Sequence, residues 1–182
     1  GKVIPLKYAK GFSIIKENDF KVITINDAWR GEKSNQQYVL YKNDKPNGYK
    51  DALKIKVPIS SIACMSLTHI AFIEALGEEN SIVAVSGGKF TTNQKVKSYL
   101  STGKIIEVGS AQSIDYESLV ERNPTIIMAY GIDESSHRYT DKLKSLGLTS
   151  VLNAEYMEVH PLGKAEWIKF VAAFYEKEEE AD

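Results

Sequence analysis

The sequence lacks several features that would each point to a class of protein. It has one cysteine, Cys64, which has no intrachain disulfide partner and is interpreted as a small buried hydrophobe. Its longest unbroken apolar run, residues 170–175, is far shorter than the roughly 18 residues that cross a bilayer. Lysine and arginine number 23 against 24 aspartates and glutamates, so no basic excess is available for a nucleic-acid backbone. A disulfide framework, a membrane span and a nucleic-acid partner are therefore not expected.

Motifs for phosphate binding, covalent catalysis and metal binding are also missing. Ser86-Gly87-Gly88-Lys89 lacks the G-x-x-x-x-G-K-[ST] spacing that wraps a phosphate, and no G-x-G-x-x-G begins a helix. Ala84 stands where a G-x-S-x-G nucleophile elbow needs its first glycine. The histidines at 69, 137 and 160 have no metal-ligand spacing, and His69 is interpreted as a core or interface residue. No catalytic residue, metal or cofactor is predicted.

The composition itself is that of a globular protein with two differently built segments. Hydrophobic residues make up 43% of the 182 positions and charged residues 26%, which suits one domain with an appendage. Residues 1–60 contain 12 basic and 6 acidic side chains, whereas the remainder contains 11 and 18. The chain begins with Gly1 rather than Met, so we expect that any signal peptide has been removed.

Residues 1–54 are predicted to form a β-rich amino-terminal extension. Strand-forming residues alternate at period two in 12–16 and 20–25, with Glu17-Asn18-Asp19 between them, which indicates a β-hairpin. Residues 38–41 resemble a further strand, and 43–48 contain turn-forming residues.

From Ile55 onward short apolar strands alternate with helices, which is typical of βαβ units and a parallel sheet. The first unit is the clearest, with a strand at 62–65, Ser66 as helix N-cap and Gly77 as the residue that ends the helix. Further strands are predicted at 82–85, 105–108 and 125–129, and further helices at 93–100, from Asp115 to before Pro124, and at 135–146. The expected fold class is α/β, a mostly parallel sheet flanked by helices.

A final helix is predicted from Gly163 to about Glu180. Its apolar residues lie on two faces, so we expect it to contact partners on two sides. The acidic run 176–180 contains no glycine or proline that would stop a helix. Two interpretations of this run stay open: a solvated frayed end, or a helix that continues beyond Asp182.

In open parallel sheets, ligands bind beyond the carboxyl ends of the strands, so the loops that begin at 65, 86, 109 and 130 should share one rim. Their serine, glutamine, lysine and aromatic side chains suit a bulky, partly aromatic ligand better than acid–base catalysis. The loop 155–161 is also dense in polar groups, and it is interpreted either as part of this site or as a structural tie for the last helix.

Several motifs along the chain resemble one protein family in their order and spacing. They are Val57-Pro58-Ile59, Met65 to Ile70, Glu74-Ala75-Leu76-Gly77, Ile82 to Gly87, Asn123 to Ile127 and the run Asn153 to Phe170. Together they resemble the substrate-binding proteins of ABC importers for siderophores, haem and cobalamin. The resemblance implies two α/β lobes joined by a long rigid helix, with the ligand between the lobes.

Under this resemblance the chain is an amino-terminal lobe. Residues 55–162 would form the ligand-binding lobe and 163–182 the start of the inter-lobe helix, with the second lobe and the signal sequence absent. The protein would be periplasmic or anchored to the cell envelope as a lipoprotein. Glu117 matches the family's glutamate that meets basic residues of the permease, although a carboxylate in a first helical turn is also favoured by the helix dipole.

The predicted function is capture of an iron–siderophore, haem or corrinoid and delivery to an ABC permease, without enzymatic activity. Lys89 would pair with an anionic chelate, and Phe90 and Tyr130 would stack on its flat parts. The full set of predicted contacts is Met65, Ser66, Lys89, Phe90, Gln112, Tyr130, Glu155 and Tyr156. Two alternatives remain: a small doubly wound enzyme that uses the Ser86 loop, and a structural envelope domain whose amino-terminal hairpins form a contact surface.

Overall fold

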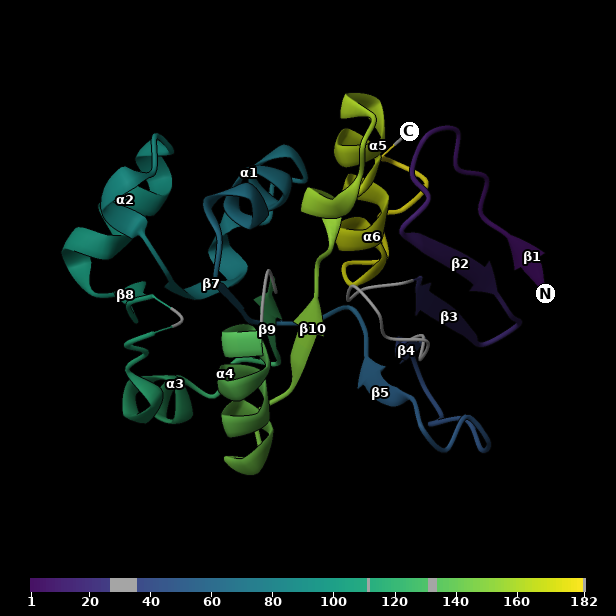
Figure 1. Ribbon diagram of the computed structural model, residues 1–182, viewed down its shortest axis with the longest axis horizontal. Coiled ribbons are helices and arrows are strands. Elements are labelled where there is room, and N and C mark those ends of the chain that lie inside the picture. The colour runs from purple at the N-terminus through teal and green to yellow at the C-terminus, as the bar shows by residue number, and fades with distance from the viewer. Residues whose placement is uncertain (27–35, 111, 131–133, 182) are drawn as a thin grey trace. The chain divides into compact units, whose positions relative to one another are not determined.

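The computed structural model describes residues 1–26, 36–110, 112–130 and 134–181 and divides into two compact units (Figure 1). The first unit comprises Gly1–Pro58 and Ala154–Asp182, and the second comprises Ile59–Asn153. Residues 154–162, predicted to belong to the lobe that begins at Ile55, group by their contacts with the amino-terminal segment. Each unit has its own five-stranded sheet.

The sheet of the first unit has the order β1-β2-β3-β4-β5. Its strands are β1 (Lys2–Val3), β2 (Phe12–Lys16), β3 (Phe20–Ile25), β4 (Gln36–Tyr41) and β5 (Leu53–Lys56). Neighbouring strands pair antiparallel except β4 and β5, which are parallel. Ile14 lies opposite Ile23 and both are fully buried, because period-two alternation directs one face of the hairpin into the core. The predicted hairpin is confirmed.

The carboxyl-terminal segment packs its aromatic side chains onto this sheet. It contains η3 (Glu155–Met157), α5 (Pro161–Glu166) and α6 (Ile168–Ala173). The ring of Phe12 lies 4.6 Å from that of Trp167 and 5.7 Å from that of Phe170, centroid to centroid. Trp167, Phe170 and Phe174 are all fully buried, so they form the centre of this unit's core.

The prediction of one helix from Gly163 to Glu180 is wrong. The helix breaks at Trp167, α6 ends at Ala173, and Glu176 then takes a left-handed conformation with φ of 61°. Lys177 N then donates to the Ala172 carbonyl at 2.9 Å and Glu176 N to the Ala173 carbonyl at 3.3 Å, the bonds of a Schellman motif. Within the acidic run Glu178 is buried whereas Glu179 and Glu180 are exposed, and residues 177–181 are not helical, so neither interpretation of the run fits all of its residues.

The second unit is built around the parallel sheet that the sequence predicts. Its order is β10-β9-β6-β7-β8, and every neighbouring pair is parallel. The strands are β6 (Ile62–Cys64), β7 (Ile82–Val85), β8 (Ile106–Glu107), β9 (Ile126–Ala129) and β10 (Ser150–Leu152). The chain runs from β6 outward to β8 and then returns to β9 on the other side of β6. The sheet order therefore reverses between β6 and β9.

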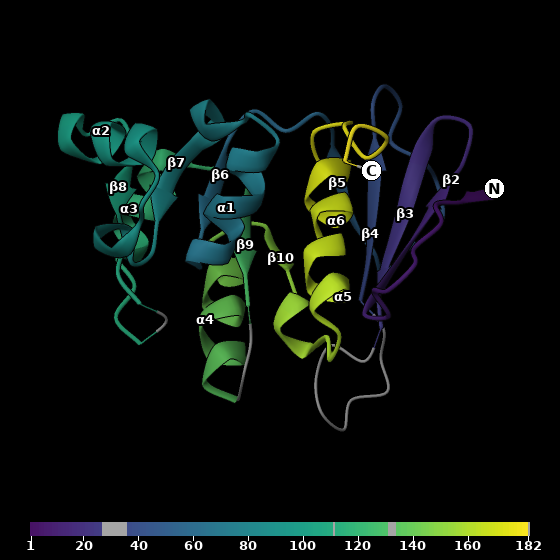
Figure 2. The ribbon, with the colours of Figure 1, turned by 90° about the horizontal axis from the view of Figure 1, so that it is seen from above.

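Helices cover both faces of this sheet. They are α1 (Leu67–Ala75), α2 (Gln94–Thr102), α3 (Tyr116–Arg122) and α4 (Glu134–Ser145), with the short turns η1 (Glu79–Ser81) and η2 (Gly88–Phe90). α1 and α2 lie on one face, and α3 and α4 on the other (Figures 1 and 2). This arrangement follows from right-handed crossovers on either side of the reversal.

Side-chain caps fix where these helices begin. Ser66 Oγ accepts from Thr68 N, and Asp115 carboxylate oxygens accept from Ser118 N and its hydroxyl, as the sequence predicts. Asn123 ends α3 in a left-handed conformation directly before Pro124. Cys64 is fully buried in β6, and burial raises the pKa of its thiol, which agrees with its predicted role as a small hydrophobe.

Candidate functional site

The loops after β6, β7 and β8 begin at one edge of the parallel sheet. Met65 N donates to the Met128 carbonyl at 3.0 Å, and Ser86 N donates to the Cys64 carbonyl at 2.9 Å. Val108 N likewise donates to the Val85 carbonyl at 2.9 Å. The first residue after each of these strands is therefore still held in register. This carboxyl edge, with the order reversal between β6 and β9, is where an open α/β sheet binds ligands.

Three of the predicted contacts present accessible side chains at this edge. Phe90 is 66% exposed, and Lys89 and Gln112 are exposed as well. Lys89 Nζ lies 4.9 Å from the centroid of the Phe90 ring, a cation–π arrangement. The turn η2 thus holds a positive charge beside an exposed aromatic face.

Two other predicted contacts have structural roles. Met65 is 4% exposed and packs in the core cluster that contains Ala63 and Ala129. The hydroxyl of Ser66 serves as the N-cap of α1. The N-cap role of Ser66 and the strand position of Met65 were both predicted, and pairing of Met65 with Met128 one residue beyond β6 carries the Met65 side chain into the core instead of the rim.

Tyr130, the first residue after β9, is half-buried and rests against a histidine of α1. Its ring and that of His69 are 6.4 Å apart in an edge-to-face arrangement, and its carbonyl accepts from the Tyr139 hydroxyl at 2.8 Å. Burial lowers the pKa of His69 to about 3, although a hydrogen bond to the Met128 carbonyl acts in the opposite direction. Within the described part of the chain, its Nδ1 has no hydrogen-bond partner. Gly131, also expected at the rim, lies outside the described residues.

Sequence reasoning missed Glu107, which follows Ile106 in the two-residue strand β8. Its carboxylate accepts hydrogen bonds from three backbone N–H groups: Gly87 at 3.1 Å, Gly88 at 2.6 Å and Gly109 at 2.9 Å. It thereby connects the loop after β7 to the loop after β8. Gly109, two residues after this glutamate, and the Gly87-Gly88 pair in the preceding loop were the available signal.

Glu155 and Tyr156 lie in η3 and belong to the first unit. Both are partly buried, and burial raises the pKa of Glu155 against the opposing charge of Lys164. Their participation in the rim of the second unit stays a prediction.

The rest of the loop 155–161 ties segments of the first unit together. Glu158 is buried and accepts from the backbone N–H of Lys10 and Gly11 and from Trp167 Nε1, at 2.9 to 3.0 Å. His160 caps α5 by accepting from Leu162 N, and its ring stacks on Tyr8 at 5.0 Å. These contacts favour the structural interpretation of the loop.

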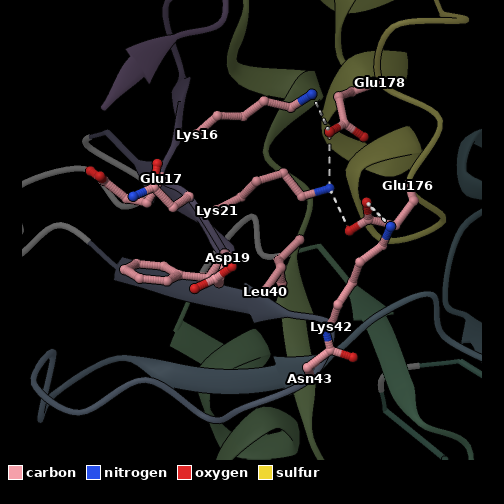
Figure 3. Close-up of a pocket in the computed structure, with 11 residues that line it drawn as sticks. Lys16, Glu17, Asp19, Lys21, Leu40, Lys42, Asn43, Glu176 and Glu178 are labelled. Carbon is pink, nitrogen blue, oxygen red and sulfur yellow. Dashed lines mark hydrogen bonds and ion pairs between the residues drawn. The ribbon is translucent and has the colours of Figure 1, made fainter.

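A pocket of about 250 Å³ lies in the first unit beside the β2–β3 turn (Figure 3). At its wall the ammonium of Lys21 lies 3.0 Å from Glu176 and 3.0 Å from Glu178. Burial acts to raise the pKa of Glu178, but a hydrogen bond from its own backbone N–H and the charges of Lys21 and Lys16 outweigh it, so the pKa is lowered. None of the predicted ligand contacts lines this pocket.

Neither a membrane-spanning helix nor a metal-binding cluster is found among the described residues. No helix among them is long and apolar enough to cross a membrane. In the same ranges, no group of three or more histidine, cysteine, aspartate and glutamate side chains is placed to hold a metal ion.

Comparisons with known proteins identify a relative by sequence and several solved structures of similar fold. No family model matches the chain. It is 36% identical over 197 residues to the uncharacterized lipoprotein MJ0878 of Methanocaldococcus jannaschii, and the match covers 97% of the chain and 47% of that protein. The chain thus spans about half the length of the relative it matches.

Solved structures match the fold at lower identity. The iron-uptake ABC transporter substrate-binding protein PiuA of Streptococcus pneumoniae has a TM-score of 0.50 and 22% identity, covering 68% of this chain and 41% of its own. The petrobactin-binding protein YclQ of Bacillus subtilis has a TM-score of 0.53 and 12% identity, covering 94% of this chain and 48% of its own. By fold, the chain resembles one lobe of the substrate-binding proteins of ABC importers.

Proposed function

We propose that this chain is part of the solute-binding component of an ABC importer. Its cargo would be an iron complex, a siderophore or haem, or a corrinoid, which the protein captures and presents to a permease. The observation that carries the proposal is the exposed Lys89–Phe90 pair at the carboxyl edge of a doubly wound parallel sheet. The fold shared with PiuA and YclQ supports it.

The exposed side chains at the rim suit a flat, partly anionic ligand. The ring of Phe90 offers a face for stacking, and Tyr130 offers a second aromatic surface. Lys89 supplies a charge-assisted hydrogen bond to a carboxylate or catecholate oxygen, and Gln112 supplies amide donors and acceptors. Capture and release on such a surface break no covalent bond, so the chain acts as a carrier and not as an enzyme.

The proposed location is the cell envelope. The relative MJ0878 is named a lipoprotein, and PiuA is named the substrate-binding protein of an ABC transporter. Glu117 supports a docking role because it is exposed in the first turn of α3. We propose that it pairs with a basic residue of the permease.

The proposal is tested by titrating the full-length protein with ferric siderophores, including ferric petrobactin, and with haem and cobalamin. Intrinsic fluorescence reports binding because the chain contains 2 tryptophans and 10 tyrosines. The test variant is Lys89→Ala/Phe90→Ala, which removes the two exposed side chains that carry the proposal. Saturable quenching by one ligand, weakened in the variant, is the expected result. No saturable response to any member of the panel would reject the proposed cargo classes.

A further inference from the structure

The carboxylate of Glu107 occupies a place where three backbone N–H groups converge. Gly87 and Gly109 donate to Oε2 at 3.1 and 2.9 Å, and Gly88 donates to Oε1 at 2.6 Å. Converging backbone N–H groups of this kind form a nest that binds anions. In this protein the anion is part of the chain.

The backbone around the nest admits little but glycine. Gly87 and Gly109 have φ of 74° and 83°, in the left-handed region where a side chain is strained. A Cβ on Gly109 would lie 2.6 Å from the Ser113 carbonyl oxygen, and a Cβ on Gly88 would lie 2.8 Å from side-chain atoms of Leu100 and Val85. The local backbone and packing therefore require glycine at these positions, which makes the nest a built feature of the two loops.

The three hydrogen bonds join the two rim loops that carry the exposed polar contacts. Gly87 and Gly88 lead directly into Lys89 and Phe90, whereas Gly109 leads into the loop that contains Gln112. Hydrogen bonds to a charged acceptor are stronger than those between neutral groups, so one carboxylate can fix the spacing of these loops.

We propose that Glu107 is a positioning residue of the rim: it acts as an internal anion that holds the Lys89–Phe90 turn against the loop after β8. It also keeps small external anions out of the nest, which leaves Lys89 as the cation that an anionic ligand meets. The statement that Lys89 meets an anionic ligand rests on the proposed function. The role of the carboxylate in ordering the loops is independent of any ligand.

The test compares wild type with Glu107→Gln and Glu107→Ala by amide hydrogen exchange, and needs no ligand. We expect the amides of Gly87, Gly88 and Gly109 to exchange about ten-fold faster or more in Glu107→Ala, because a hydrogen bond to a charged group is lost. Added acetate should restore their protection saturably, since its carboxylate fits the vacated nest. Chloride at equal ionic strength should not restore it, and acetate should not change wild type. Glu121→Gln, which alters an exposed glutamate of α3, is the matched control.

Two results would overturn the inference. One is unchanged protection of the three amides in both Glu107 variants, and the other is exposure of the amides that acetate fails to reverse. Circular dichroism and the urea midpoint show whether Glu107→Ala is folded. If it is not, the exchange rates of the same three amides in Glu107→Gln test the inference. An acetate-dependent nest combined with a silent ligand panel would keep the role of Glu107 and reject the proposed cargo.

Discussion

The imidazole of His69 meets the ring of Tyr130 edge to face, with 6.4 Å between centroids and 73° between ring planes. His69 lies in α1, which follows β6, and Tyr130 directly follows β9, so the contact spans the point where the sheet order reverses. The Tyr139 hydroxyl holds the carbonyl of Tyr130 at 2.8 Å. Tyr130 is thus supported from its ring and from its backbone.

His69 should make folding sensitive to acid. The pKa of His69 is about 3 in the folded protein, against an ordinary value of 6.5, because the ring is buried. Between those values only the unfolded state takes up this proton, so the free energy of unfolding falls as the pH is lowered through this window. The slope from this one group is about 1.4 kcal/mol per pH unit.

Urea unfolding at pH 7, 5 and 4 checks this prediction. His69→Gln should start from lower stability, because it loses the contact with Tyr130, but it should lose less on acidification than wild type. His69→Phe, which keeps an aromatic ring, should show the same flatter dependence. Parallel curves for wild type and both variants would contradict it.

Lys21 should be the most costly lysine of the first unit to replace. It is 4% exposed, and its ammonium bonds the Ala173 carbonyl and the carboxylates of Glu176 and Glu178 at 3.0 Å each. Lys21→Met leaves Glu178 buried with Lys16 as its remaining ion-pair partner, at 3.3 Å. We expect a loss of about 3 kcal/mol, measured by urea unfolding at neutral pH.

Lys42→Met is the matched control, because the Lys42 side chain is 59% exposed and lies 3.7 Å from Glu176. It should change stability by less than about 1 kcal/mol. Similar effects of the two substitutions would show that Lys21 does not hold the end of the chain. Acid unfolding gives an independent check, because folding lowers the pKa of Glu178. The contribution of Glu178 to the free energy of unfolding is therefore present above pH 4.5 and is lost as the pH falls through its pKa in the folded protein.

The sequence predicts the second unit well because its signals are local. Ser66 and Asp115 each cap a helix within three residues, and Asn123 before Pro124 marks a helix end. Apolar runs separated by such caps identify βαβ units without knowledge of distant contacts. The parallel sheet and its carboxyl rim follow from this alternation.

The features that the sequence analysis missed depend on distant or backbone partners. Glu178 stands in a run with the composition of a solvated end, but its own side chain is buried and bonded to Lys21, 157 positions earlier in the chain. No side chain next to Glu107 in the sequence marks its role, since its partners are main-chain N–H groups of glycines in two loops. Helical periodicity and charge runs carry no information about either contact.

Phe90 should affect ligand affinity without affecting stability. Its side chain is 66% exposed, so Phe90→Ala should change the free energy of unfolding by no more than about 0.5 kcal/mol. Loss of one aromatic contact should weaken binding about five- to ten-fold. Titration of the full-length protein measures the change, with Val120→Ala, an exposed apolar residue of α3, as the control. If neither Phe90→Ala nor Tyr130→Ala alters affinity for a ligand that wild type binds, the rim assignment fails.

Glu117 should be needed for transport but not for binding. It is exposed in the first turn of α3, so Glu117→Arg reverses a charge at the surface and costs at most about 1 kcal/mol through the helix dipole. Glu74→Arg, an exposed position on α1, is the matched charge reversal. In an uptake assay with the full-length protein and its permease, Glu117→Arg should impair transport while its ligand affinity equals that of wild type. Glu74→Arg should transport normally. Normal uptake by both variants would contradict the docking role and leave Glu117 only its favourable interaction with the helix dipole. Equal impairment by both would indicate a general effect of surface charge.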